Sequence, residues 1–294
     1  MDLKIAETEL VLNKDGSVYH LHLKNENIAD TVIIVGDQGR VNEVSKYFDT
    51  IEFRIQNREF VTHTGTYKGA RITVLSTGIG PDNIDIAINE LDAAININPV
   101  TRTINKNKRV LNIIRIGTSG ALQHDVPVDS FVVSSFGLGL DGLIHYYQYA
   151  FDEEEKQLTR KIVEHLNWNP DLATPYVVRG SEALIATIGD GMINGITATA
   201  AGFYGPQGRK LRLNLDNPDI NESLTSFQHE GYRITNFEME TSALYGLGSL
   251  LGHNCCTCCA IIANRIEKKY SEDHEKTINA LILQVLNSIV TNLK

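Results

Sequence analysis

The sequence predicts an α/β fold: one domain with a central mixed, largely buried, twisted β-sheet flanked by helices. Apolar strand-like runs alternate along the chain with helical patterns, which is typical of α/β proteins. The runs are continuously apolar, as expected of strands that are covered on both faces. No internal repeat, low-complexity tract or Pro/Ser-rich linker divides the 294 residues. We therefore predict a single domain over residues 1–294, in which residues 1–18 form an N-terminal extension.

The predicted strands are short runs rich in β-branched and other apolar residues. They cover residues 31–35, 71–76, 110–116, 130–134, 175–178 and 258–263. All four cysteines of the chain fall in residues 255–259, which lead into the last run. No second Cys/His cluster stands at the spacing of a metal site, so we interpret them as small hydrophobic residues that begin a buried strand, with reduced thiols.

Four helices are predicted among these strands. They cover about residues 81–95, 152–166, 240–251 and 272–293. Pro81 and Asp82 give a start signal for the first helix, after which apolar residues recur on one face. Gly252 ends the third.

Composition restricts the possible partners. The chain has 36 acidic and 27 basic residues and a net charge of -9, which argues against binding to nucleic acid or to an anionic membrane. An anionic substrate would need a local cluster of arginines. No apolar run approaches the ~18–20 residues of a membrane helix. The opening of the chain lacks the apolar stretch of an export signal, so we expect a cytoplasmic protein.

Residues 137–142, Gly-Leu-Gly-Leu-Asp-Gly, formally match the dinucleotide-binding pattern G-x-G-x-x-G. That pattern holds a dinucleotide only where it joins a strand to the N-terminus of a helix. Residues 143–149 follow it here and are aromatic rather than helical in pattern. We therefore do not predict a dinucleotide site.

Glycines and arginines stand directly after three predicted strands. These groups are residues 36–40, 76–80 and 115–120. Ligands of open α/β sheets gather beyond the carboxyl ends of the strands. Glycine lets backbone N–H groups approach an anion, and arginine adds a charge and a fork of donors. A single arginine is usually a surface or ion-pair residue, but the combination in an acidic protein favours an anion site.

In their order along the chain, these motifs resemble the signature of the nucleoside phosphorylase family. The matching segments are Gly36-Asp37-x-x-Arg40, Ser76-Thr77-Gly78-Ile79-Gly80 running into Glu90-Leu91, Arg115-Ile116-Gly117-Thr118-x-Gly120 and Asn236-Phe237-Glu238-Met239-Glu240. The family includes uridine phosphorylases, purine nucleoside phosphorylases and some nucleosidases. The resemblance extends from about Tyr19 to the C-terminus. It implies the family's fold, inorganic phosphate as co-substrate, no cofactor and no metal.

The resemblance implies a phosphate site formed by four residues of one chain and one of its neighbour. Gly36, Arg40, Arg115 and Thr118 would hold phosphate, and Arg58 would reach it from a neighbouring subunit. Without the family context, Arg58 would be an ordinary surface charge.

The implied ribose site adjoins the phosphate site. Thr118, Met239 and Glu240 would hold the ribose, and His20 would reach its 5′-hydroxyl from the adjacent subunit. A carboxylate can accept both hydrogen bonds of a cis-diol, and its charge favours an oxocarbenium-like sugar. Alone, Glu240 would be a helix N-terminal acid and His20 a surface or core residue. The shared residues imply a homo-oligomer, either a dimer or a hexamer of dimers.

Residues 202–209 resemble the base-binding segment of the uridine branch of the family. Phe203 would stack near the base, while Gln207 and Arg209 would bind the pyrimidine edge and stabilise the charge of departing uracil. The resemblance also puts Ser119 and Gly120 at the base.

The last core strand carries a second sign of base preference. Purine-specific relatives tend to have an Asp shortly after it. Here the strand ends in Asn264-Arg265-Ile266-Glu267, as in the uridine branch, and we expect Arg265 to support the base-binding segment.

The expected reaction is therefore the reversible phosphorolysis of uridine to uracil and ribose 1-phosphate, with Arg115, Arg209 and Glu240 as catalytic residues. The alternatives are a purine nucleoside phosphorylase, a hydrolytic nucleosidase and a non-catalytic nucleoside-binding protein on the same fold. The chain departs from the family pattern at residues 38–39 and 81–83, and its stretch 177–194 is longer than in compact relatives.

Overall fold

The computed structural model describes residues 4–293. Its strands are β1 (Thr31–Val35), β2 (Thr50–Asn57), β3 (Phe60–Tyr67), β4 (Ala70–Ser76), β5 (Ile97–Asn98), β6 (Thr103–Ile104), β7 (Asn112–Ala121), β8 (Phe131–Gly139), β9 (Tyr176–Arg179), β10 (Ile193–Thr199), β11 (Gln228–His229), β12 (Tyr232–Glu238), β13 (Asn254–Asn264) and β14 (Lys269–Tyr270). Apart from the β5–β6 pair, they form one twelve-stranded sheet.

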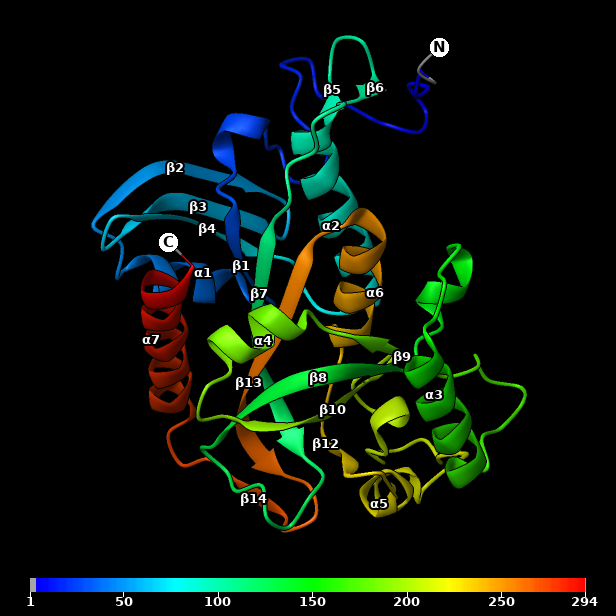
Figure 1. Ribbon diagram of the computed structural model, residues 1–294. Helices are drawn as coiled ribbons and strands as arrows, with labels where there is room; N and C mark the ends of the chain where they lie inside the picture. Colours follow the sequence, from blue (N-terminus) through cyan, green and yellow to red (C-terminus); the bar gives the residue numbers. More distant parts are fainter. Residues whose placement is uncertain (1–3, 294) are drawn as a thin grey trace.

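The sheet runs through the whole molecule, with helices on both sides (Figure 1). Its order is β11-β12-β10-β8-β13-β7-β1-β4-β3-β2, with β9 beside β8 and β14 beside β13. The central strands β13, β7, β1 and β4 are mutually parallel, whereas β8 runs antiparallel to β13. The predicted α/β fold with a central mixed sheet is confirmed.

One strand pairing closes part of the sheet into a ring. β12 also pairs antiparallel with β7, so that Asn236 faces Ala121 and Phe237 faces Gly120. The strands β7, β13, β8, β10 and β12 are thereby joined in a closed circuit of hydrogen bonds. No sequence pattern indicated this closure, which brings the carboxyl end of β12 beside that of β7.

The helices are α1 (Gln38–Ser45), α2 (Pro81–Asn96), α3 (Glu153–Leu166), α4 (Glu182–Ile188), α5 (Ile220–Ser226), α6 (Thr241–Leu251) and α7 (His274–Asn292), with short 3₁₀ turns η1 (Asn25–Asn27), η2 (Leu143–Tyr146) and η3 (Gly205–Gln207). The four predicted helices are α2, α3, α6 and α7. Their ends follow from local chemistry. Pro81 begins α2, Asp152 caps α3 by accepting from the N–H of Glu155 at 2.8 Å, and Gly252 ends α6 in the left-handed region.

The alternation of side chains along β1 explains the layers. Val32 and Ile34 join a core with α2 and α6, whereas Ile33 and Val35 join another with α1, α4 and α7. Figure 1 shows α6 and α7 on opposite sides of β13. The apolar face of α7 is almost completely buried, and each such side chain contributes about 1.5–3 kcal/mol to the free energy of folding. A third core lies between α3, α5 and the strands β8, β10 and β12.

The cysteines and the G-x-G-x-x-G segment have structural roles. All four cysteines lie buried in β13 as free thiols, as predicted. Gly137 and Gly139 lie inside β8, which is longer than predicted. A Cβ on Gly137 would come within 2.7 Å of the backbone of Ser242, and one on Gly139 within 2.2 Å of the ring of Tyr176. These glycines allow close packing against α6 and β9.

Residues 1–3 of the predicted N-terminal extension lie outside the described range. Further along, Ile5 and Arg102 exchange hydrogen bonds of 2.8 and 2.9 Å, and Leu10 and Leu12 pack against the core around α2. Among residues 4–293, no helix is long and apolar enough to cross a membrane.

Candidate active site

The guanidinium of Arg115 is buried between two carboxylates. Its Nη1 lies 3.1 Å from Oε2 of Glu238, and its Nη2 donates to Oε2 of Glu240. These three side chains are between 2% and 6% exposed. Burial works to lower the pKa of Arg115, but the two carboxylates raise it well above its ordinary value. Burial raises the pKa of Glu240, with Arg115 opposing the rise and Glu238 adding to it.

Two glycines make this arrangement possible. Arg115 folds back over Gly117, where a Cβ would come within 2.0 Å of Nη1. Gly80 has a φ of +104°, a conformation that side chains disfavour, and its N–H donates to Oε1 of Glu240 at 2.8 Å. The glycines of two separate motifs therefore hold one buried ion pair.

The predicted end of this strand at residue 116 is wrong. β7 extends to Ala121, so residues 117–120 lie inside the strand and not after it. The glycines do not end β7 because it pairs with β13 along its length, and neighbouring arginines fill their side-chain space: Arg115 at Gly117, and Arg265 at Gly120.

The three predicted anion-binding segments do converge. Arg40, in the first turn of α1, donates from Nη1 to the carbonyl of Ile116 at 3.4 Å, one residue from Arg115. Burial and Arg115 lower the pKa of Arg40. Gly36 adjoins the β4–α2 loop, because a Cβ there would lie 3.5 Å from the carbonyl oxygen of Gly78.

Thr118 and Met239 lie close in sequence to the residues of the buried cluster. Both are partly exposed: Thr118 follows Gly117, and Met239 lies between Glu238 and Glu240. Within residues 4–293, neither side chain hydrogen-bonds to the cluster. Their predicted contacts are with substrate, and they stay predictions.

Glu238 had no predicted role, although it lies in a matching motif. Its Oε1 accepts from Oγ1 of Thr199 at 2.9 Å and from the N–H of Thr241 at 3.0 Å, and its Oε2 accepts from the N–H of Glu240 at 3.0 Å. Glu238 therefore fixes both Arg115 and the backbone that carries Glu240. The sequence feature that could have indicated this role is the presence of two glutamates on either side of Met239, at the end of a strand.

The predicted base-binding residues form a second group. The guanidinium of Arg209 lies 3.8 Å from the centroid of the Phe203 ring, and its Nη1 donates to the carbonyl of Phe203 at 2.7 Å and to Oε1 of Gln207. Burial and the nearby Arg265 lower the pKa of Arg209 to about 10, so it stays charged at neutral pH. Phe203 is 50% exposed and Gln207 is buried.

Arg265 connects this group to the sheet, as expected. Its Nη2 donates to the carbonyl of Gln207 at 2.9 Å, and its Cγ would lie 3.2 Å from a Cβ on Gly120. Ser119, next to Gly120, accepts from Nδ2 of Asn236 at 2.9 Å. β7 thus runs from the Arg115 cluster to the Gln207–Arg209 group.

His20 and Arg58 lie together at the edge of the sheet. His20 Nδ1 is 2.6 Å from Oε1 of Glu90 on α2, and its carbonyl accepts from Nδ2 of Asn57 at 2.8 Å. The exposed Arg58 has a φ of +54° and donates to the hydroxyl of Tyr19 at 3.3 Å. The two residues that were assigned to a neighbouring subunit's site therefore share one surface.

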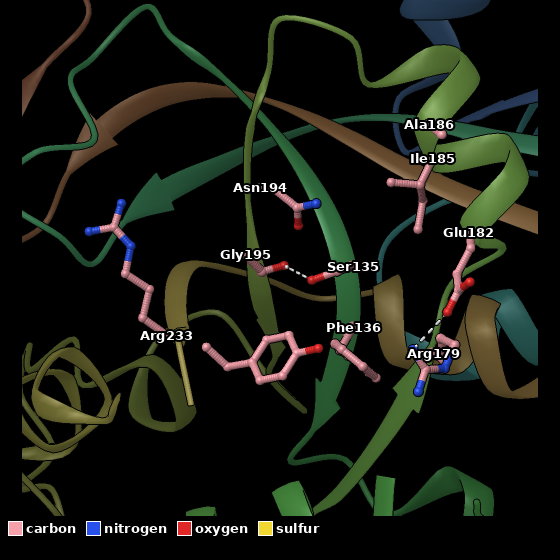
Figure 2. Close-up of a pocket in the computed structure, with 11 residues that line it drawn as sticks. Ser135, Phe136, Arg179, Glu182, Ile185, Ala186, Asn194, Gly195 and Arg233 are labelled. Carbon is pink, nitrogen blue, oxygen red and sulfur yellow. Dashed lines mark hydrogen bonds and ion pairs between the residues drawn. The ribbon is translucent and has the colours of Figure 1, made fainter. Parts of the chain in front are cut away.

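A cavity of about 460 Å³ lies elsewhere, toward the amino ends of β10 and β12. Figure 2 shows Asn194, Ser135 and Arg179 around it, and most of its wall comes from residues 177–194, β8 and β12. Its two arginines already have acidic partners: Arg179 pairs with Asp152, Glu154 and Glu182, and Arg233 pairs with Asp125. No predicted site residue lines it, so this cavity is not part of the candidate active site.

Comparison with known proteins identifies the family of the chain. The model of the phosphorylase superfamily matches residues 30–291. A uridine phosphorylase from Thermococcus kodakarensis is 32% identical over 273 residues, covering 93% of this chain and 87% of that protein. A DeoD-type purine nucleoside phosphorylase from Listeria monocytogenes is 24% identical, covering 92% and 98%.

Comparison with solved structures identifies the same family. A Trypanosoma brucei nucleoside phosphorylase, described as showing uridine phosphorylase activity, superposes with a TM-score of 0.87 at 29% identity, covering 96% of this chain and 99% of that one. With the family model spanning most of the chain, this protein belongs to the phosphorylase superfamily.

Proposed function

We propose that the chain is a uridine phosphorylase, which cleaves uridine reversibly with inorganic phosphate to give uracil and ribose 1-phosphate. The observation that carries this proposal is the buried Arg115–Glu240 pair beside Arg40. This pair brings groups suited to binding an anion and a group suited to binding a diol into one cluster. A hydrolytic nucleosidase would need the carboxylate but would have little use for the arginines.

The substrates would bind across this cluster. Phosphate would lie between Arg40, Arg115 and Thr118, near the backbone of Gly36, and Glu240 would accept hydrogen bonds from the ribose 2′- and 3′-hydroxyls. Phosphate would then stand below C1′ of the ribose, on the face opposite the base.

The reaction follows from this placement. The bond between C1′ and N1 of uracil lengthens first, and its electron pair passes to the base while positive charge develops on the sugar. The carboxylate of Glu240 favours that charge. A phosphate oxygen then bonds to C1′ with inversion, and the uracil anion takes a proton from solvent. Proximity and preorganised charge supply the rate enhancement.

The choice of uracil rests on Gln207 and Arg209. The Gln207 amide can both donate and accept, while Arg209 donates and carries a charge that stabilises departing uracil. At the end of β13, Asn264 donates from Nδ2 to the carbonyls of Gln123 and Val126, and beyond the strand Glu267 pairs with His124 and Lys269. Neither residue is the Asp that purine-specific relatives tend to carry. The similarity to two proteins described as having uridine phosphorylase activity supports the same choice.

The complete site would require a second subunit. Arg58 and His20, which share one surface, would complete the phosphate and ribose sites of a neighbour. We therefore propose a homo-oligomer, at least a dimer, acting on small molecules in the cytoplasm.

A panel of nucleosides tests the proposal. The protein is incubated with uridine, thymidine, inosine and adenosine, each with and without phosphate, and base release is followed by absorbance. We expect phosphate-dependent release of uracil from uridine. Preference for inosine would indicate a purine nucleoside phosphorylase, and no turnover would indicate a binding protein.

A further inference from the structure

Arg115 is shared between two carboxylates that are held very unequally. Apart from Arg115, Glu238 accepts hydrogen bonds from Thr199, Thr241 and the N–H of Glu240. Among residues 4–293, the carboxylate of Glu240 accepts, besides the bond from Arg115, a hydrogen bond from the N–H of Gly80. Glu238 is therefore held more firmly by its surroundings than Glu240, whose Oε2 is engaged by Arg115.

The two charged groups that the substrates need are paired with each other. Nη2 of Arg115 donates to Oε2 of Glu240, so phosphate must compete with Glu240 for the guanidinium and the ribose must compete with Arg115 for the carboxylate. Both groups are buried, and an unpaired buried charge is costly. Either substrate binding alone would leave one member of the pair without its partner.

We propose that Glu238 is a positioning residue that holds Arg115 while Glu240 is handed over to the ribose. The inference rests on the proposed function. Phosphate takes the Nη2 donor, the ribose diol takes the Oε2 acceptor, and Nη1 of Arg115 stays paired with Glu238 throughout. Each substrate relieves the cost that the other creates, so phosphate and nucleoside promote each other's binding to the same extent.

Glu→Gln substitutions at positions 240 and 238 test this proposal, because they should change the affinity for phosphate in opposite directions. In Glu240→Gln the competitor for Arg115 is neutralised, and phosphate alone should bind about 5-fold tighter than to the wild type. In Glu238→Gln, Arg115 loses its fixed partner and pairs with Glu240 only, so phosphate alone should bind at least about 5-fold more weakly. The simple removal of a negative charge near an anion would strengthen binding in both variants.

The matched control is Glu155→Gln. Glu155 is also buried, but it caps α3 and contacts none of the site residues. Phosphate affinity, measured by isothermal titration calorimetry, should be unchanged in this variant. Equal affinities for phosphate in the wild type and Glu240→Gln, or a gain in Glu238→Gln, would overturn the proposal.

A second measurement needs no variant. Initial rates of the wild type are measured over a grid of uridine and phosphate concentrations. We expect the KM for phosphate to fall by about 5-fold or more between low and saturating uridine. A KM for phosphate that is independent of uridine would overturn the handover while leaving the proposed function intact, whereas no phosphate-dependent uracil release at all would remove both.

Discussion

The guanidinium of Arg115 occupies the space that a side chain on Gly117 would fill, within 2.0 Å of its Cβ position. The nearest atom belongs to the end of a flexible side chain, so Gly117→Ala should fold but displace Arg115 from its carboxylates. We expect kcat/KM for phosphate to fall by about 100-fold or more. Initial-rate kinetics measure this effect, and thermal unfolding checks that one cooperative transition remains. Activity within a few-fold of the wild type would contradict the prediction.

At Gly139, unlike Gly117, an added side chain would meet a ring that is held in place. A Cβ there would come within 2.2 Å of the ring of Tyr176, which is buried and hydrogen-bonded through its hydroxyl to Asp141 and Ser242. Because this ring cannot move freely, Gly139→Ala should lower the free energy of unfolding by about 1–3 kcal/mol. Urea denaturation measures the change. Gly205→Ala is the control, because its nearest neighbour would be 3.9 Å away and its effect should stay within about 0.5 kcal/mol.

Arg209 should matter for the base more than for phosphate. It contacts Phe203 and Gln207, away from the Arg115 cluster. In Arg209→Ala, the turnover of uridine should fall by about 100-fold, while the affinity for phosphate should stay nearly unchanged. Steady-state kinetics and phosphate titration compare the two. Equal losses of both would refute the role in base binding.

The pKa of Glu240 gives a prediction for pH. Burial raises this pKa above the usual 4.5, and the ionised carboxylate accepts hydrogen bonds from the diol more strongly than the protonated acid does. The affinity for uridine without phosphate should therefore fall on acidification, with a midpoint above that of an ordinary glutamate. In Glu240→Gln the affinity should be low at every pH. A midpoint at or below 4.5 in the wild type would contradict the assignment.

Mixed oligomers test the position of Arg58. Arg58→Ala and Arg115→Ala should each be nearly inactive alone. If Arg58 serves a neighbour's site, unfolding and refolding the two together creates hybrid dimers with one intact site. Random mixing would then restore on the order of a quarter of the wild-type activity. If each Arg58 serves its own chain, every site stays defective and no activity returns.

The sequence predicted the parts of the fold that bury continuous apolar runs. β1, α2 and α7 were predictable because their side chains are almost entirely hydrophobic on the buried faces. β12 was missed because buried polar groups interrupt it: Thr235 and Asn236 are fully buried and satisfied by hydrogen bonds to each other and to neighbours. β2 was missed because it alternates between exposed and partly buried residues.

The sequence motifs predicted which residues form the site, but not how their side chains contact one another. The resemblance identified Arg115 and Glu240, and the structure brings them into contact. The role of Glu238 depends on three hydrogen bonds from residues distant in sequence or from backbone, which no motif records. The closure of β12 on β7 was equally invisible, because it rests on two residue pairs between distant segments.

The identity of the sugar product tests the proposed phosphorolysis most directly. Uridine is incubated with the protein in phosphate buffer, and uracil and sugar are quantified by nuclear magnetic resonance. We expect one ribose 1-phosphate for each uracil and no release when phosphate is omitted. Uracil release at the same rate without phosphate, with free ribose as the product, would contradict it.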